Sequence, residues 1–239
     1  TIDVLEVGLI PKYLQWRQNL ERDYGIKLTY GGGMKGCATM LGQICGITNF
    51  LTWILTDPGQ IRKLVHCWLE ISIRYIQTLR HITNYPSDRT GFAFFSDVAG
   101  MLSPELYRGF LMEAERELYD LFAPYPRDKR FYHADYHMLH HLDALGEIGV
   151  NEVNIDPYIE ASQILKRLPG AVVYGQIPPT TVLLYGSPED VADCIKRDIQ
   201  QAGQTKQLVV CTAGSINPGT SFGNLRAMCY AVEEYGNIY

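Results

Sequence analysis

Short apolar stretches alternate with longer amphipathic stretches along the whole chain, and this alternation constrains the fold more than any other feature. The stretches Gly91–Asp97 and Ala171–Gln176 are apolar at most positions, which is typical of parallel strands buried on both faces. The segments between such stretches, for example Pro58–Thr83, place apolar residues at helical spacing. Parallel strands joined by helices predict an α/β fold.

Six strands are expected from this alternation. They are Ile26–Tyr30, Gly91–Asp97, Phe131–His133, Val150–Asp156, Ala171–Gln176 and Leu208–Ala213. The expected helices are Pro11–Arg22, Cys37–Cys45, Thr48–Leu55, Pro58–Thr83, Ser103–Phe122, a His-rich helix from about Asp135 to Gly146 or Gly149, Ile159–Leu168, Ser187–Gln201 and Asn224–Tyr235. A closed eight-stranded β/α barrel needs two further strands and typically has about 250 residues.

The composition fits one large core. The chain has 239 residues, of which 46% are hydrophobic, so we expect a single domain spanning residues 1–239. Its net charge of -5 speaks against binding to nucleic acid, which needs clustered Lys and Arg. No apolar run approaches the roughly 20 residues that span a bilayer, so no membrane segment is expected. The six cysteines form no C-x-x-C pair, which favours a reducing, cytoplasmic setting.

Polar residues follow the ends of the expected strands. The set comprises Asp97, His133 with Asp135, Asn154 with Asp156, Gln176, and Ser215 with Asn217. The C-terminal ends of parallel barrel strands converge on one mouth, where barrel enzymes carry their chemistry. Each residue alone also fits a turn former or a helix cap, above all Asp135 and Asp156. The set as a whole favours a functional site at a shared mouth.

The segment Arg130–Asp143 holds four of the six histidines. Within it, His133-x-Asp135-x-His137 could supply half of a zinc site, since imidazole and carboxylate are zinc ligands. His141 would follow His137 by one helical turn, although the segment contains no H-E-x-x-H motif. We expect His140 and His141 to lie on a solvent-exposed helix face.

Two further features bear on the site. Cys211 is the thiol nearest to the expected mouth, and its alternative role is that of a small buried apolar residue. The run Gly31–Gly33 belongs to neither phosphate-binding motif, G-x-x-x-x-G-K-[ST] or G-x-G-x-x-G. Its glycines would let a ligand approach the backbone, so Gly33 is a candidate substrate-binding residue.

Several stretches also match the motifs of one family, in the same order and at similar spacing. They are Gly33–Gly46, Asp97 with Leu102–Tyr107, His133-Ala134-Asp135, Tyr174–Pro179, and Ala213–Asn217 with Asn224–Met228. In this order and at this spacing, the chain resembles the uroporphyrinogen decarboxylase superfamily, with its H-x-D/C element and its G-N-x-D-P turn. The resemblance implies a (β/α)8 TIM barrel. The first two strands of that barrel precede the part that this chain matches, which accounts for the six expected strands.

Three branches of the superfamily differ in chemistry. The decarboxylases hold substrate carboxylates with an arginine-rich segment that precedes the matched part. The methylcobalamin:thiol methyltransferases bind zinc through H-x-C and a Cys after the last-strand Gly, and this chain has Asp135 and Ser215 at those positions. The demethylating methyltransferases, which pass a methyl group to a corrinoid protein, are similar in the A-G-S-I-N and G-Q-x-x-P motifs.

The resemblance to the third branch implies a corrinoid-dependent methyltransferase. It would move a methyl group between a small methylated substrate, such as an aryl methyl ether, and a corrinoid on a partner protein. The catalytic assignments are His133, Asp135 and Asp97, with His133 and Asp135 as ligands if zinc is bound. The substrate-binding assignments are Asn154, Asp156, Gln176, Ser215 and Gly33. A homodimer is also expected. The alternatives are a uroporphyrinogen decarboxylase and a non-enzymatic subunit that binds a corrinoid or a tetrapyrrole.

Overall fold

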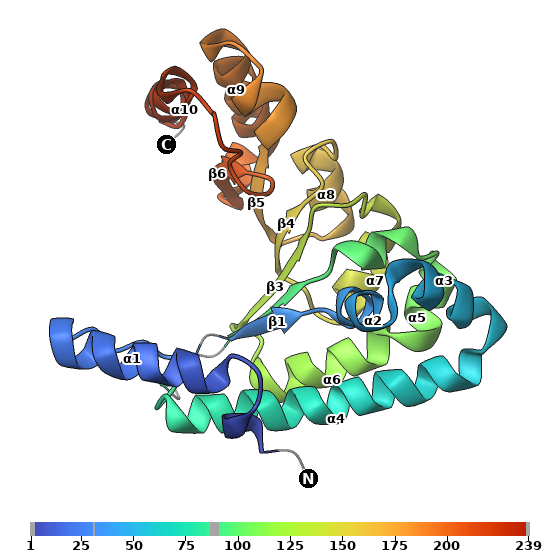
Figure 1. The fold of residues 1–239 in the computed structure, drawn as a ribbon. Coiled ribbons are helices and arrows are strands. Elements are labelled where there is room, and N and C mark those ends of the chain that lie inside the picture. Colours follow the sequence, from blue (N-terminus) through green and yellow to red (C-terminus); the bar gives the residue numbers. More distant parts are fainter. Residues whose placement is uncertain (1–2, 31, 87–90, 238–239) are drawn as a thin grey trace.

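Six parallel strands form one sheet in which the spatial order equals the order along the chain (Figure 1). The computed structural model describes residues 3–30, 32–86 and 91–237. The strands are β1 (Gly33–Lys35), β2 (Gly91–Phe95), β3 (Lys129–Ala134), β4 (Glu152–Ile155), β5 (Val172–Ile177) and β6 (Leu208–Thr212). Each neighbouring pair is parallel, as the continuously apolar strands predicted.

Helices connect the strands and pack along one side of the sheet (Figure 1). They are α1 (Ile10–Tyr24), α2 (Cys37–Cys45), α3 (Ile47–Thr56), α4 (Pro58–Ile82), α5 (Pro104–Phe110), α6 (Met112–Phe122), α7 (Leu142–Glu147), α8 (Ala161–Arg167), α9 (Pro188–Ala202) and α10 (Phe222–Tyr235). Several begin where the sequence places a cap followed by proline. Asp57 accepts the backbone N–H of Gln60 at the start of α4, and Ser187 forms a capping box at the start of α9.

Strand alternation divides the sheet into two faces. On the helix side, Phe92, Phe94 and Tyr132 are buried, and the rings of Phe94 and Tyr119 meet edge to face at 4.9 Å between centroids. On the inner side, Phe95 remains 44% exposed. The helix-side face therefore holds the main core, and the inner face is the one that a barrel would enclose.

The expected strand at Ile26–Tyr30 is wrong, because the first strand lies at Gly33–Lys35. Tyr30 donates its backbone N–H to Thr83 Oγ1 at the end of α4, so this segment is held by a helix end instead of a strand. Glycine is required at Gly33, where an added Cβ would lie 2.9 Å from the Cβ of Ala93 on β2. Gly31 of the same run lies outside the described residues.

Two helix predictions also need correction. The helix expected over Ser103–Phe122 is two helices, α5 and α6, which meet at Leu111. The His-rich helix does not begin near Asp135, because the Asp135 backbone N–H donates to the Asp97 carboxylate and holds the chain in a loop. A short 3-10 helix at Leu139–His141 and then α7 follow this loop.

The described residues contain no single helix that is long and apolar enough to cross a membrane. Helices α2 and α3 would pass that test only if they were taken together. They are bent against each other by 107°.

Candidate functional site

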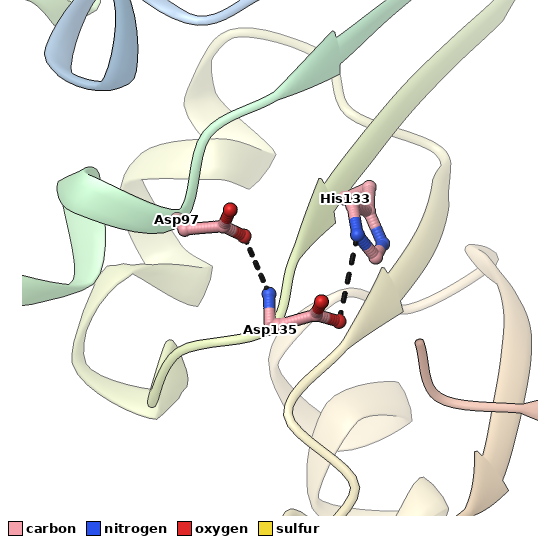
Figure 2. A group of neighbouring side chains, drawn as sticks. All are labelled: Asp97, His133 and Asp135. Carbon is pink, nitrogen blue, oxygen red and sulfur yellow. Dashed lines mark hydrogen bonds and ion pairs between the residues drawn. The ribbon is translucent and has the colours of Figure 1, made fainter. Parts of the chain in front are cut away.

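The ends of β2 and β3 bring three predicted site residues into one cluster (Figure 2). Asp97 is the second residue after β2, His133 is the second-to-last residue of β3, and Asp135 is the first residue after β3. One potential ligand atom from each side chain lies within 4.8 Å of the others. The cluster of Asp97, His133 and Asp135 is called the mouth cluster below.

The imidazole of His133 is held by Asn154, its register partner on β4. His133 Nδ1 lies 2.8 Å from Asn154 Oδ1 and 3.0 Å from the Asn154 backbone oxygen. Both partners are acceptors, so Nδ1 carries a proton and donates it. The other ring nitrogen, Nε2, faces Asp135 Oδ1 at 3.5 Å. An imidazole fixed in this way presents one nitrogen to the mouth, as metal-binding histidines do.

The side-chain amide of Asn154 uses all of its hydrogen-bonding positions. Its Nδ2 donates to the backbone oxygens of Tyr174, at 2.6 Å, and Thr212, at 3.0 Å. Its Oδ1 accepts from the backbone N–H of Gly214 at 3.2 Å as well as from His133. An amide group has two donors and two acceptor positions, and all four are used here. In this structure Asn154 therefore positions His133 and the loop after β6.

The carboxylate of Asp135 lies against Gly214 in the loop after β6. Its own backbone N–H donates to Asp97 Oδ1 at 2.8 Å. Gly214, at φ +107°, lies so close that an added Cβ would be 2.7 Å from Asp135 Oδ1, so glycine is required there. Burial raises the pKa of the Asp135 carboxyl, His133 lowers it, and the negative charge of Asp97 raises it further.

The mouth cluster suits a divalent metal ion with nitrogen and oxygen ligands. Tetrahedral zinc with bonds of about 2.0–2.1 Å needs ligand atoms roughly 3.3 Å apart, and the His133–Asp135 separation of 3.5 Å is close to this. Three protein ligands would leave a fourth position open for water or substrate, as in catalytic zinc sites.

Cys211 does not complete this set in the structure. Its sulfur lies 4.0 Å from Asn154 Nδ2, on the inner face of β6. Burial raises the pKa of the Cys211 thiol to about 11, which disfavours the thiolate form that binds zinc. Within the part of the chain that the structure describes, the group that could hold a metal includes no cysteine.

A cavity of about 620 Å³ opens beside the mouth cluster. It is lined by Asp135, Tyr136, His137, Asp156, Pro157, Tyr158, Pro179, Thr180, Ala213, Gly214, Ser215 and Asn217. Four residues of the predicted set, Asp135, Asp156, Ser215 and Asn217, thus line one cavity. We call this space the mouth pocket.

The pairing of His137 with Asp156 was not anticipated. His137 Nδ1 lies 2.7 Å from Asp156 Oδ2, and Asp156 Oδ1 accepts the backbone N–H of Tyr158. Asp156 is only 5% exposed, whereas His137 is open to the pocket. His137 therefore belongs to this pair and is not a member of the mouth cluster. The sequence singled out His137 because it follows His133 by four residues. That spacing did not indicate that its partner would be Asp156.

Gln176 and Gly33 lie away from the pocket wall. Gln176 is completely buried, and its Nε2 donates to the backbone oxygens of Asp156, at 2.8 Å, and Ile159, at 2.9 Å. It thus supports the loop that carries Asp156. Gly33 lies within β1 against Ala93. Direct substrate contact by either residue has no support in this arrangement.

The expectation that His140 and His141 occupy a solvent face is wrong. His141 is completely buried, and its Nε2 donates to the backbone oxygen of Ala99 at 2.9 Å. His140 is partly buried and donates to the backbone oxygen of Leu102 at 3.0 Å. Burial lowers the pKa of His141 to about 4, which keeps its ring neutral. Both rings join the β3–α7 loop to the segment after β2.

The parallel strands and the polar cluster at their C-terminal ends define a protein of the β/α-barrel class. The family model of uroporphyrinogen decarboxylase (URO-D) matches residues 5–235, and the chain belongs to this family. The match confirms the family resemblance that the sequence motifs indicated.

Two relatives that are similar in sequence have different activities. Uroporphyrinogen decarboxylase of Prochlorococcus marinus (strain NATL2A) is 30% identical over 140 residues, which are 55% of this chain and 37% of that protein. Methylcobamide:CoM methyltransferase MtbA of Methanosarcina mazei is 22% identical over 233 residues, which are 97% of this chain and 66% of that protein. These relatives are enzymes, and the chain spans at most about two thirds of their length.

A solved structure of a methyltransferase from Methanosarcina mazei has the same fold. It matches with a TM-score of 0.76 at 18% identity, over 98% of this chain and 67% of that chain. The likeness confirms the predicted fold class, with six of the barrel strands present in this chain.

Proposed function

We propose that this protein is a corrinoid-dependent methyltransferase, which takes a methyl group from a small methylated substrate and passes it to a corrinoid on a partner protein. The observation that carries the proposal is the mouth cluster, in which one imidazole nitrogen and two carboxylates converge beside an open pocket. The similarity to a methylcobamide:CoM methyltransferase over 97% of this chain supports it.

The chemistry of demethylation explains what such a cluster can do. When the methyl group leaves, the electron pair of the broken bond stays on the oxygen or nitrogen of the substrate. That atom must therefore be activated by a positive charge, a proton or a Lewis acid. When bound, the corrinoid supplies the nucleophilic cobalt that accepts the methyl group. The pocket beside the cluster would hold the substrate with its leaving atom toward Asp135 and His133.

A metal ion would be held by Asp97, His133 and Asp135. It would supply Lewis acidity at the leaving atom. The residues around the cluster serve this role by fixing its geometry, since Asn154 orients His133 and Asp97 holds the backbone of Asp135.

The test is anaerobic incubation of the purified protein with cob(I)alamin and a panel of methyl ethers and methylated amines, followed by the absorbance of the corrinoid. We expect protein-dependent methylation of the corrinoid by at least one donor, and loss of this activity in His133→Ala. His66→Ala provides the control, because His66 is an exposed histidine on α4. The proposal fails if no donor methylates the corrinoid.

A uroporphyrinogen decarboxylase is the second candidate. The observation that favours it is the 30% identity with the Prochlorococcus enzyme over 140 residues. In that case Asp97 would accept hydrogen bonds from pyrrole N–H groups of the substrate. Incubation with uroporphyrinogen tests it, since release of CO₂ and a less carboxylated product would favour decarboxylation over methyl transfer.

A further inference from the structure

The described residues that line the mouth pocket include two carboxylates and neither a lysine nor an arginine side chain. Asp135 and Asp156 both line it, and Asp97 lies directly behind Asp135. Among the described residues that form the walls, His137 is the only one with a basic side chain, and it is bonded to Asp156. An anionic ligand would meet repulsion in this pocket, whereas a cation would relieve the crowding of the carboxylates.

Two tyrosine rings complete the lining. Tyr136 and Tyr158 line the pocket, and they are 44% and 70% exposed. Pro157 and Pro179 add apolar surface between the polar groups. Aromatic faces attract organic cations through the ring quadrupole, and proteins use aromatic side chains to bind quaternary ammonium groups. The cavity of about 620 Å³ has ample room for a small ion of this kind.

We propose that the mouth pocket binds an N-methylated ammonium ion, with its charge facing Asp156 and Asp135 and its methyl groups against Tyr136 and Tyr158. This inference rests on the proposed methyltransferase function and names its substrate class. It replaces the aryl methyl ether, which is neutral and would make no use of the two carboxylates. The substrate binds with the mouth cluster free of metal, because an ammonium ion and a metal ion would compete for Asp135.

The chemistry of the transfer is consistent with such a substrate. The carbon–nitrogen bond breaks and its electron pair stays on nitrogen, while the methyl carbon forms its new bond with an electron pair of the corrinoid cobalt. The ammonium ion thereby becomes a neutral amine, so no proton has to be delivered to the leaving atom. A cationic nitrogen carries its own activation, which an ether oxygen would need from an acid or a metal.

Calorimetric titration of the purified protein with choline and with 3,3-dimethyl-1-butanol tests the inference. The second compound has the same shape with carbon in place of the charged nitrogen. We expect choline to bind at least tenfold more tightly, and its affinity to fall in Asp156→Asn and in Tyr136→Leu while that of the neutral analogue changes little. Asp193→Asn, an exposed carboxylate on α9 outside the pocket lining, is the matched control and should bind choline as the parent does.

Equal binding of choline and its neutral analogue, or tighter binding of 3,3-dimethylbutanoate, overturns the inference. If Asp156→Asn does not fold, the comparison of the two ligands and the Tyr136→Leu variant still decide it. The two proposals fail separately. Methyl transfer from anisole without choline binding refutes only the cationic substrate, and choline binding without methyl transfer from any donor refutes only the methyltransferase.

Discussion

Carboxylates lie on opposite sides of β2 and β3, and the two sites differ in burial, in hydrogen bonding and in access to a ligand. Ser96 and Asp97 are consecutive, as are Tyr132 and His133, and consecutive residues here turn to opposite sides. Ser96 and Tyr132 face the helices, where Glu115 of α6 lies. Asp97 and His133 face the mouth.

The helix-side carboxylate is buried and hydrogen-bonded. Glu115 is completely buried, and it accepts hydrogen bonds from Tyr107 Oη at 2.8 Å and from the backbone N–H of Cys37 at 3.0 Å. The second bond caps the start of α2. Burial raises the pKa of Glu115 to about 7. This carboxyl group has no access to a ligand, so its contribution is to stability.

The mouth cluster is open and less tightly bonded. The side chain of Asp135 is 57% exposed, and Asp97 is exposed as well. The Asp135 carboxylate lines the mouth pocket, and Asp97 accepts one hydrogen bond, from the backbone N–H of Asp135. The comparison teaches that Glu115, sealed among helix-side donors, serves stability, whereas the exposed carboxylates beside a fixed imidazole are placed to meet a ligand. Four predictions test this division.

The largest expected effect is on activity. His133→Ala should lower methyl transfer roughly a thousandfold, in the range seen when a catalytic acid, base or ligand is removed. The free energy of unfolding should change by only about 1 kcal/mol, because His133 is at the open side of the sheet. Rates and urea unfolding curves measured on the same preparation check both parts. A loss of several kcal/mol with activity retained would reverse the roles of the two clusters.

Glu115→Ala should lower the stability of the protein and leave the mouth cluster intact. It leaves the buried Tyr107 hydroxyl and the N–H of Cys37 without an acceptor, which costs about 3 kcal/mol of unfolding free energy. Zinc binding by the folded variant at low temperature should be unchanged. Exposed Glu113→Ala on the same helix is the control, with an expected effect within about 0.5 kcal/mol.

Asn154→Ala should weaken metal binding, because it releases the imidazole of His133. Removing the acceptor of His133 Nδ1 frees the ring to rotate, and loss of such a partner typically weakens metal binding about 10–100-fold. Titration with zinc and a competing chelator measures the affinity. An unchanged affinity would mean that His133 is not a ligand.

The smallest expected effect is a pH dependence of stability. The pKa of Glu115 rises from 4.5 to about 7 on folding, so the native state keeps a proton that the unfolded chain loses in this window. The stabilising contribution is complete below pH 4.5 and is lost as the pH rises through about 7. The slope is at most about 1.4 kcal/mol per pH unit. Denaturation curves of Glu115→Gln should lack this slope, and an identical slope in both proteins would contradict the assignment.

The sequence was sufficient for most of the fold because β2, β5 and β6 are largely apolar and several helices begin at clear caps. It failed at β1, where Ile26–Tyr30 alternates like a strand but is held by the end of α4. Gly32 and Gly33 allow the close approach to β2, because an added Cβ at either would collide with that strand.

The mouth cluster was predictable from the strand ends, but its surroundings were not. The bond between His137 and Asp156 spans 19 residues, and the bond between His141 and the Ala99 carbonyl spans 42. Such contacts arise from the packing of loops that follow different strands. No local pattern separates a buried histidine from an exposed one, nor Glu115 from Glu113 two residues before it.

The most direct test of the central claim follows an isotopically labelled methyl group. Purified protein is incubated anaerobically with cob(I)alamin and a labelled N-methylated ammonium donor, and the label is traced by nuclear magnetic resonance. The account predicts that label appears on the corrinoid with the parent protein and with His66→Ala but not with His133→Ala. Label that stays on every donor, together with loss of CO₂ from uroporphyrinogen, would contradict it.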